Sequence, residues 1–215
     1  MKFQHFIFDF DGTLVDSMPY WAKNMVDLLE MYGVEYPANI IEIVTPLGNF
    51  GSAKYFREEL GVDQTEEELC RQMSITVIPK YRDEIPLKEG VRSYLQELRD
   101  AGCKLHVLTA SPHVTLDVCL KRNGIYDLFD NIWSIDDFGL TKSNPQIYLE
   151  AIKRLGTTVE KTVFFDDNIG AVQTAMQAGL FTVGCYDDSG KNFQDKLKTT
   201  CDIYIHSFSE RPFLS

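Results

Sequence analysis

The chain has 215 residues, 44% of them hydrophobic, and a formal net charge of −11 from 32 acidic and 21 basic residues. This length predicts one medium domain, or a domain with a smaller insert, and the hydrophobic content is sufficient for a folded core. The acidic balance argues against nucleic acid or an anionic membrane as the main partner. The apolar runs are far shorter than the ~20 residues that a membrane span needs.

The cysteines and the N-terminus predict a cytoplasmic protein. The N-terminal residues lead straight into a strand pattern and lack the features of a signal peptide. The five cysteines, at positions 70, 103, 119, 185 and 201, are odd in number and show no C-x-x-C spacing. We therefore expect reduced thiols rather than a disulfide framework.

The first predicted strand is Phe6-Ile7-Phe8, and it runs into Asp9-Phe10-Asp11-Gly12-Thr13. Two carboxylates at the tip of a buried strand repel each other and are costly to desolvate, so they need a partner. On an extended strand Asp9 and Asp11 point to the same side, and Gly12 permits a sharp turn.

Three interpretations of this pentapeptide compete: an acidic turn, a calcium loop, and a nucleophilic aspartate with a neighbouring acid/base that acts on a metal-bound phosphate. A calcium loop of EF-hand type needs glycine at its sixth position and glutamate at its twelfth. This chain has Leu14 and Tyr20 there, so the calcium loop is excluded and the other two interpretations stay open.

The next 70 or so positions, about 16–85, read as helical, with no convincing strand. The apolar side chains of 18–32 recur at three- and four-residue steps and stop at Gly33. Two further helices are predicted over about 50–60 and 65–82.

From Leu87 onward, predicted helices and strands alternate. The predicted helices cover 90–101, 113–123, 145–155 and 169–178, and the predicted strands 105–108, 131–134, 162–165, 181–184 and 203–205. Alternation with nearly continuous apolar strands is typical of a parallel sheet covered on both faces. The sequence therefore predicts an α/β fold with a Rossmann-like core formed by 1–15 and 86–215, and an inserted helical domain over 16–85.

Ligands of open parallel sheets bind at the carboxyl ends of the strands, and polar residues follow several of the predicted strands. They are Asp9 and Asp11, then Thr109-Ala110-Ser111, then Asp166-Asp167-Asn168, with Lys142 in the loop before the 145–155 helix. Each has an ordinary explanation as well: Ser111 before Pro112 could be a helix N-cap, Asp166-Asp167 an acidic cap, and Lys142 a solvated lysine. Their joint occurrence at strand ends favours one site.

In this order the motifs resemble those of the haloacid dehalogenase superfamily, in particular its phosphoglycolate phosphatase-like and β-phosphoglucomutase-like branch with a helical cap. The resemblance covers essentially the whole chain, and the stretch from Phe8 to Pro19 is very close to that branch. One departure is Lys142-Ser143-Asn144-Pro145, where the family usually has proline directly after the lysine.

The resemblance implies a magnesium-dependent phosphatase. Asp9 would be the nucleophile that forms an aspartyl-phosphate, and Asp11 the acid and base. Mg²⁺ would be held by the Asp9 carboxylate, the Asp11 backbone carbonyl, Asp167 and Asp166, in keeping with its preference for oxygen ligands. Thr109, Ala110 and Lys142 would bind the phosphate. An acid at position 11 favours phosphoester over dehalogenase chemistry.

Hydrolysis is favoured over a β-phosphoglucomutase-like phosphomutase, because 24–53 contains no Lys or Arg to hold a second phosphate. Tyr20, Trp21, Thr45 in the predicted loop 45–49, and Ser111 are candidates for substrate discrimination. The competing explanation for Trp21 is ordinary packing inside the helical domain. His113 is either a residue of the site or a solvated helix residue.

Two non-enzymatic alternatives remain: a receiver-like signalling module and a phosphate-binding protein without catalysis. Receivers place their acidic pair early in a shorter chain, whereas here the acidic pair comes last. The expected partner is a small phosphorylated metabolite, and we expect a monomer or weak dimer.

Overall fold

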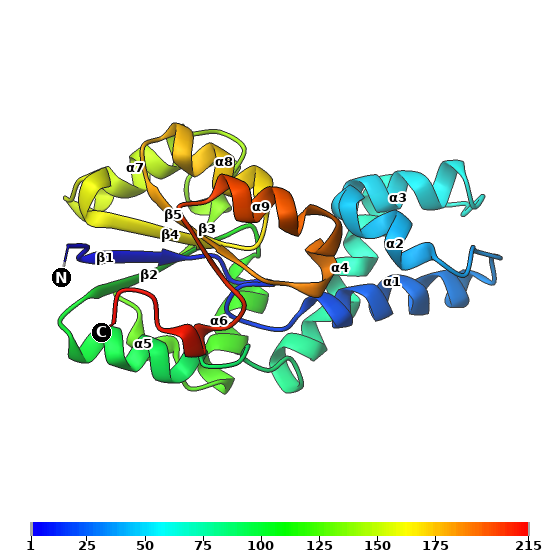
Figure 1. The fold of residues 1–215 in the computed structure, drawn as a ribbon. Helices are drawn as coiled ribbons and strands as arrows, with labels where there is room; N and C mark the ends of the chain where they lie inside the picture. The colour runs from blue at the N-terminus through cyan, green and yellow to red at the C-terminus, as the bar shows by residue number, and fades with distance from the viewer. Residues whose placement is uncertain (1, 215) are drawn as a thin grey trace. The chain divides into compact units, whose positions relative to one another are not determined.

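The computed structural model describes residues 2–214 and contains one six-stranded parallel sheet within them (Figure 1). The strand order is β3-β2-β1-β4-β5-β6. The strands are β1 (His5–Phe8), β2 (Lys104–Thr109), β3 (Asn131–Ser134), β4 (Thr162–Asp166), β5 (Phe181–Cys185) and β6 (Ile203–Ile205). This arrangement confirms the predicted α/β class and all six predicted strands.

The register of β1 explains why the polar strand ends converge. Phe8, the last residue of β1, is level with Val107 of β2 and Phe165 of β4. Asp9, which donates its N–H to Phe165 O at 2.8 Å, is therefore beside the last residue of β4, Asp166. The order places β1 at the centre, where the chain connections reverse direction across the sheet, and this is where ligands bind in open α/β sheets.

Helices cover both faces of the sheet, as Figure 1 shows, with α7 and α8 on one face and α5 and α6 on the other. The helices of this part are α5 (Val91–Asp100), α6 (His113–Arg122), α7 (Gln146–Leu155), α8 (Ile169–Gln177) and α9 (Gln194–Thr200). Strand side chains such as Ile7 and Phe164 pack with Tyr148 of α7 in one core layer. Phe8 and Phe165 pack with Tyr94 of α5 in the other.

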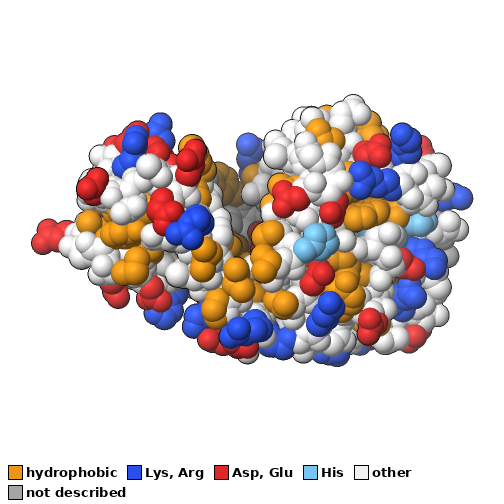
Figure 2. Space-filling view, turned by 180° about the vertical axis from the view of Figure 1, so that it is seen from behind, with side chains coloured by type: hydrophobic (Ala, Val, Ile, Leu, Met, Phe, Trp, Pro, Cys, Tyr) orange, Lys and Arg blue, Asp and Glu red, His pale blue; other side chains and the backbone are white. Residues whose placement is uncertain are grey.

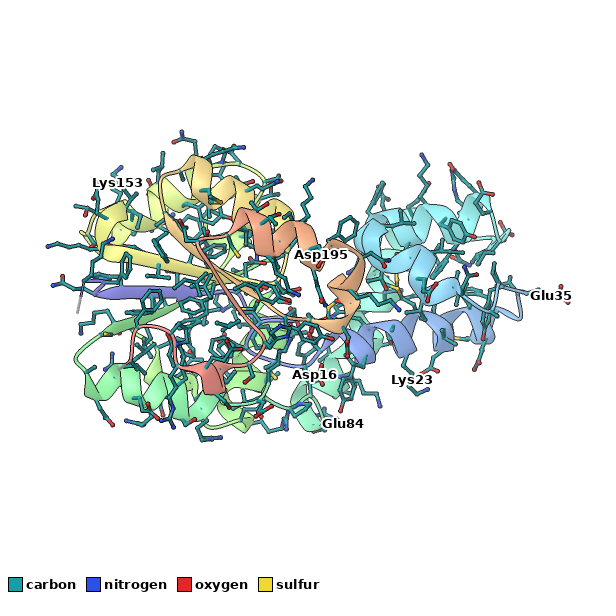
Figure 3. The ribbon with its side chains drawn as sticks, in the orientation of Figure 1. Asp16, Lys23, Glu35, Glu84, Lys153 and Asp195 are labelled. Atoms are coloured by element: carbon teal, nitrogen blue, oxygen red, sulfur yellow. The ribbon has the colours of Figure 1, made fainter. Side chains whose placement is uncertain are left out.

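Residues 17–84 form a separate compact unit, and the remaining described residues, up to 16 and from 85, form the other. Asp16 and Glu84, both labelled in Figure 3, are the last residues before the chain passes from one unit to the other. The helices of the smaller unit are α1 (Met18–Tyr32), α2 (Ile40–Val44), α3 (Gly48–Glu58) and α4 (Glu66–Asp83). Its core contains Leu29, Phe56 and Met73.

Two helices were not predicted, α2 and α9. The α2 segment is rich in β-branched residues, which lowers helix propensity, but burial of Ile40 and Val44 in the core of the smaller unit offsets this. The predicted loop 45–49 is wrong, because Thr45–Leu47 form a 3₁₀ turn and Gly48 already begins α3.

No helix in residues 2–214 is both long and apolar enough to cross a membrane. On the face seen in Figure 2, acidic and basic side chains are interspersed over the described residues.

Candidate active site

Three carboxylates meet at the carboxyl end of the central strands. Carboxylate oxygens of Asp9, Asp166 and Asp167, one from each, all lie within 4.8 Å of one another. Asp9 is 5% exposed and Asp166 is fully buried. Such closely spaced buried carboxylates cannot all be ionised without a compensating positive charge.

Lys142 supplies part of that charge. Its Nζ donates to Asp9 Oδ1 at 2.6 Å and to Asp166 Oδ2 at 2.7 Å, and its side chain is 13% exposed. The backbone carbonyl of Lys142 accepts from the hydroxyl of Tyr148, which fixes the loop before α7. The departure from the usual lysine–proline pair therefore leaves the lysine in contact with the acidic cluster.

The pKa values of these groups reflect burial and the mutual effect of the charges. Burial raises the pKa of Asp166 to about 7; the Lys142 ammonium opposes this shift, and the Asp9 carboxylate adds to it. Burial and the neighbouring Asp166 and Asp9 carboxylates raise the pKa of Asp167 well above its ordinary value. Burial alone would lower the pKa of Lys142, but the Asp166 and Asp9 carboxylates raise it above its usual range.

Asp167 is positioned by the loop that follows β1. The Thr13 hydroxyl donates to Asp167 Oδ1 at 3.0 Å and accepts from the Asp167 N–H at 3.1 Å. Gly12 has φ +74°, and a Cβ built there would lie 2.6 Å from Asp167 Oδ2. Glycine at this position allows the loop backbone to approach the carboxylate closely.

Asn168 completes the segment after β4. The Asp166 carboxylate accepts the Asn168 N–H at 2.7 Å. The Asn168 side chain accepts from the N–H groups of Gly170 and Ala171, so it is the N-cap of α8. The capping explanation therefore applies to Asn168, whereas Asp166 bonds Lys142 and Asp167 bonds Thr13.

Asp11 lies beside Ser111, whose hydroxyl donates to the Asp11 carboxylate. The alternative explanation of Ser111 as a helix N-cap does not hold, because Pro112 has extended backbone (ψ 155°) and takes that position without a side-chain bond. The Ser111 hydroxyl is instead turned toward the loop after β1. Ser111 is thus a buried side chain of the site.

The two remaining predicted phosphate-binding residues are the last residue of β2 and the one that follows it. Thr109 is buried, and its hydroxyl oxygen accepts from the Ser111 N–H at 3.1 Å. Ala110 is exposed, immediately beyond the strand. The chain therefore makes a short turn from Thr109 to Ser111, closed by the bond to the Thr109 hydroxyl.

The candidates in the smaller unit have contacts of their own there. Trp21 Nε1 donates to the Tyr81 hydroxyl at 2.7 Å, and Trp21 packs against the core of that unit, which agrees with the packing explanation. Thr45 donates to the carbonyl of Ile41 at 2.7 Å, within its own turn. Tyr20 is a partly buried residue of α1.

His113 is an exposed residue at the start of α6. Its Nδ1 lies 2.9 Å from Asp117 Oδ1 and its Nε2 lies 3.0 Å from Asp137 Oδ2. These bonds, first that to Asp117 and then that to Asp137, raise the pKa of His113. Both ring nitrogens are thus engaged by acidic residues of the core unit.

The acidic cluster fits a divalent metal ion. Three carboxylates with oxygens within 4.8 Å of one another are hard donors of the type that Mg²⁺ prefers, and Mg²⁺ is usually held by one or two carboxylates with water and substrate phosphate completing its shell. Asp11 is outside this carboxylate cluster, as expected if only its backbone carbonyl takes part. Burial and the neighbouring carboxylates raise the pKa values of Asp166 and Asp167, and a bound cation would oppose this rise.

Two contributors to this site were not recognised in the sequence. Thr13 belongs to the motif around Asp9, but its bond to Asp167 depends on how β1 and β4 are paired. Lys88 bonds to the Gly12 carbonyl at 2.7 Å. Its only sequence signal is its position just after the helical insert, which is too weak to identify it.

The chain has several relatives of similar length. It is 28% identical to YhcW of Bacillus subtilis over 175 residues, and this alignment covers 81% of this chain and 79% of that protein. It is 24% identical over 213 residues to hexitol phosphatase B of Escherichia coli (95% and 92%). It is 25% identical over 174 residues to the phosphorylated carbohydrates phosphatase of Thermotoga maritima (81% and 81%).

Solved structures share the fold. CbbY from Rhodobacter sphaeroides, in complex with phosphate, superposes with a TM-score of 0.80 at 22% identity, covering 98% of this chain and 96% of that one. A predicted phosphoglycolate phosphatase from Haemophilus somnus superposes with a TM-score of 0.81 at 19% identity (98% and 96%).

The match to a family model settles the resemblance drawn from the motifs. The model of the haloacid dehalogenase-like hydrolases covers residues 3–179, which include the three strand ends of the acidic site and the loop with Lys142. The phosphatases among the relatives agree with the predicted enzyme class, a phosphoric monoester hydrolase. The chain therefore belongs to the haloacid dehalogenase-like hydrolase family.

Proposed function

We propose that the protein is a magnesium-dependent phosphatase that hydrolyses small phosphorylated metabolites, of the sugar phosphate or phosphoglycolate type, through an aspartyl-phosphate intermediate. The observation that carries this proposal is the buried Asp9 carboxylate, bonded at 2.6 Å to Lys142 and clustered with Asp166 and Asp167. The Lys142 ammonium holds the Asp9 carboxylate through one of its oxygens, and a carboxylate oxygen is the nucleophile that the proposal requires.

In the first half-reaction a carboxylate oxygen of Asp9 attacks phosphorus. The bond between phosphorus and the leaving oxygen breaks, and Asp11 gives that oxygen its proton. General acid catalysis of this kind contributes about 10²–10⁴-fold. The Ser111 hydroxyl, which donates to the Asp11 carboxylate, would hold Asp11 in place for this transfer.

In the second half-reaction Asp11, now ionised, takes a proton from water. The resulting oxygen attacks phosphorus, the bond from phosphorus to Asp9 breaks, and inorganic phosphate and the free Asp9 carboxylate are formed. The same residue thus acts as acid and then as base, and the enzyme returns to its starting state.

Asp9, Asp166, Asp167 and the Asp11 backbone carbonyl would hold Mg²⁺. When bound, Mg²⁺ would offset the negative charge of the phosphoryl oxygens, which is a large contribution in phosphoryl transfer. Lys142 would contribute a further positive charge, and the Thr109 hydroxyl and Ala110 N–H would donate to a phosphoryl oxygen.

The substrate class is proposed from the relatives and from the smaller unit. Several relatives are named for phosphorylated sugars or polyols. Tyr20, Trp21, Thr45 and Ser111 remain our candidates for substrate discrimination. The five cysteines are free, in keeping with a reaction in the cytoplasm. A monomer or weak dimer remains our expectation.

The proposal is tested by hydrolysis of p-nitrophenyl phosphate with and without Mg²⁺, followed by a panel of phosphorylated metabolites. We expect metal-dependent release of phosphate that is abolished in Asp9→Asn. Asp136→Asn is the matched control, because Asp136 is an exposed aspartate after β3, a neighbouring strand end. An active Asp9→Asn protein, or no metal-dependent turnover of any substrate, would contradict the proposal.

The phosphomutase alternative is separated by a different assay. Positions 24–53 contain no Lys or Arg, whereas a mutase must hold a second phosphate. We therefore expect β-glucose 1-phosphate to yield phosphate and no glucose 6-phosphate. Formation of glucose 6-phosphate would assign the mutase activity instead.

A further inference from the structure

Lys88 lies among three oxygen acceptors from two separate segments of the core unit. Its Nζ donates to the Gly12 carbonyl at 2.7 Å, to Asp187 Oδ2 at 2.9 Å and to the Tyr186 carbonyl. The side chains of Lys88 and Asp187 are 16% and 4% exposed. An ammonium group has three donors, so every one of them is used.

The acceptors on one side belong to a fixed part of the sheet. Tyr186 and Asp187 directly follow β5, and β5 pairs with β4. Asp187 Oδ1 also accepts from the Ser189 N–H at 3.0 Å and from its hydroxyl at 2.5 Å. Asp187 is therefore held from both sides and provides a rigid anchor for the ammonium.

The acceptor on the other side belongs to the loop that carries the proposed catalytic pair. Gly12 directly follows Asp11, and its Cα packs against the Asp167 carboxylate so closely that a Cβ would lie 2.6 Å from Oδ2. A shift of the Gly12 backbone would therefore displace Asp11 and change the space around Asp167. The bonds of Lys88 join this loop to the end of β5.

We infer that Lys88 is a positioning residue, an internal cation that fixes the loop after β1 against the end of β5 and so keeps Asp11 and Asp167 in their working geometry. This inference rests on the proposed function, and it concerns a residue whose bonds to Gly12, Tyr186 and Asp187 involve none of the three clustered carboxylates. Lys142 neutralises the cluster directly; Lys88 would act on it only through the backbone of Gly12.

The geometry suggests chemical rescue as the test. In Lys88→Ala the removed atoms correspond to n-propylammonium, and the oxygens of Gly12, Tyr186 and Asp187 would remain as its ligands. A cavity of about 220 Å³ is lined by Lys88, Tyr186 and Thr13, so there is room for a small amine beside this place. Tetramethylammonium, which has no N–H donor, is the matched control ion.

We expect Lys88→Ala to lower kcat by about 10–100-fold with little change in KM, because small displacements of catalytic groups have effects of this size. Propylammonium should restore a large part of kcat and tetramethylammonium should not. Lys88→Arg should keep more activity than Lys88→Ala. Lys104→Ala is the control variant, because Lys104 begins β2 and its side chain is 55% exposed.

A second readout does not depend on turnover. The N–H groups of Gly12, Leu14 and Val15 bond within the loop, at 3.0, 2.9 and 3.0 Å. Their hydrogen exchange should be about tenfold or more faster in Lys88→Ala and slow again with propylammonium, because a released loop opens more often. This measurement decides the inference even if the protein hydrolyses none of the phosphates tested.

Loss of the buried ammonium leaves Asp187 without its charge partner, and Lys88→Ala could fail to fold. Asp187→Asn then serves instead, since the amide oxygen can still accept from Ser189. We expect the same faster exchange in the loop and a lower kcat. Wild-type exchange and wild-type kcat in a folded Lys88→Ala or Asp187→Asn protein, or loss of kcat with no rescue and unchanged exchange, would overturn the inference.

Discussion

The buried His106 of β2 should make stability depend on pH in a way that a single substitution removes. His106 is 1% exposed, with its Nε2 lying 3.1 Å from His5 Nδ1 and its Nδ1 3.1 Å from Asn131 Nδ2. With the amide of Asn131 donating, the ring is neutral and its proton lies on Nε2. Protonation would put a charge into this buried chain of hydrogen bonds.

Burial, reinforced by the neighbouring His5, lowers the pKa of His106 from 6.5 to about 3, although Asp130 opposes the shift. The unfolded chain therefore binds a proton that the folded chain does not, between pH 6.5 and about 3. The contribution of neutral, buried His106 to stability is therefore complete well above pH 6.5 and is lost as the pH falls. The free energy of unfolding changes by at most about 1.4 kcal/mol per pH unit for one such proton. Because the unfolded imidazole is only half protonated at pH 6.5, the change between pH 6.5 and pH 4.5 is about 2 kcal/mol.

The substitution His106→Gln keeps a donor and an acceptor but cannot titrate. Urea denaturation from about pH 4.5 to 7.5 should show a smaller loss of stability on acidification than in the wild type, with the difference approaching the value above. Titration of the acidic cluster is common to both proteins and cancels in the difference. Parallel pH profiles for the two proteins would refute the assignment of a neutral, buried His106.

The remaining predictions concern single contacts. Gly12→Ala should cost about 1–3 kcal/mol in thermal unfolding, because of the positive φ and the approach to Asp167; an unchanged melting temperature would contradict this. Trp21→Phe should cost about 1 kcal/mol in urea denaturation by removing the bond to Tyr81, and an unchanged midpoint would show that bond to be unimportant. The pKa of His113 is raised in the folded protein, so the contribution of protonated His113 to stability is present below pH 6.5 and is lost as the pH rises through the folded-state pKa. His113→Gln should therefore reduce the loss of stability on the alkaline side of the pH profile. Parallel alkaline profiles for the variant and the wild type would exclude this contribution.

The location of the candidate site could be predicted because it depends on a general property of parallel sheets. Asp9, Thr109 and Asp166 each end or follow an apolar strand, and strands β1, β2 and β4 prove to be neighbours with their ends level. Lys142 follows the same logic less directly, since it lies in a loop after the neighbouring β3. Strand ends are visible in the sequence, and their convergence follows from the parallel arrangement.

The contacts that support the site could not be predicted, because they depend on side-chain direction and register rather than on pattern. Ser111 before Pro112 has the sequence of an N-cap, yet the extended backbone at Pro112 turns its hydroxyl to Asp11. Lys88 and Asp187 are 99 positions apart along the chain and meet only because β5 lies beside β4. Neither residue is unusual in its local sequence.

The charges of the site argue for a divalent ion over a monovalent one. Three carboxylates, those of Asp9, Asp166 and Asp167, lie together, and one ammonium, that of Lys142, bonds two of them. Full ionisation would leave two negative charges, and a phosphate monoester would add more. A monovalent cation would leave the cluster negative even before substrate arrived, whereas Mg²⁺ would balance it. Substrate would then meet a site without net repulsion, which is what phosphoryl transfer requires of its surroundings.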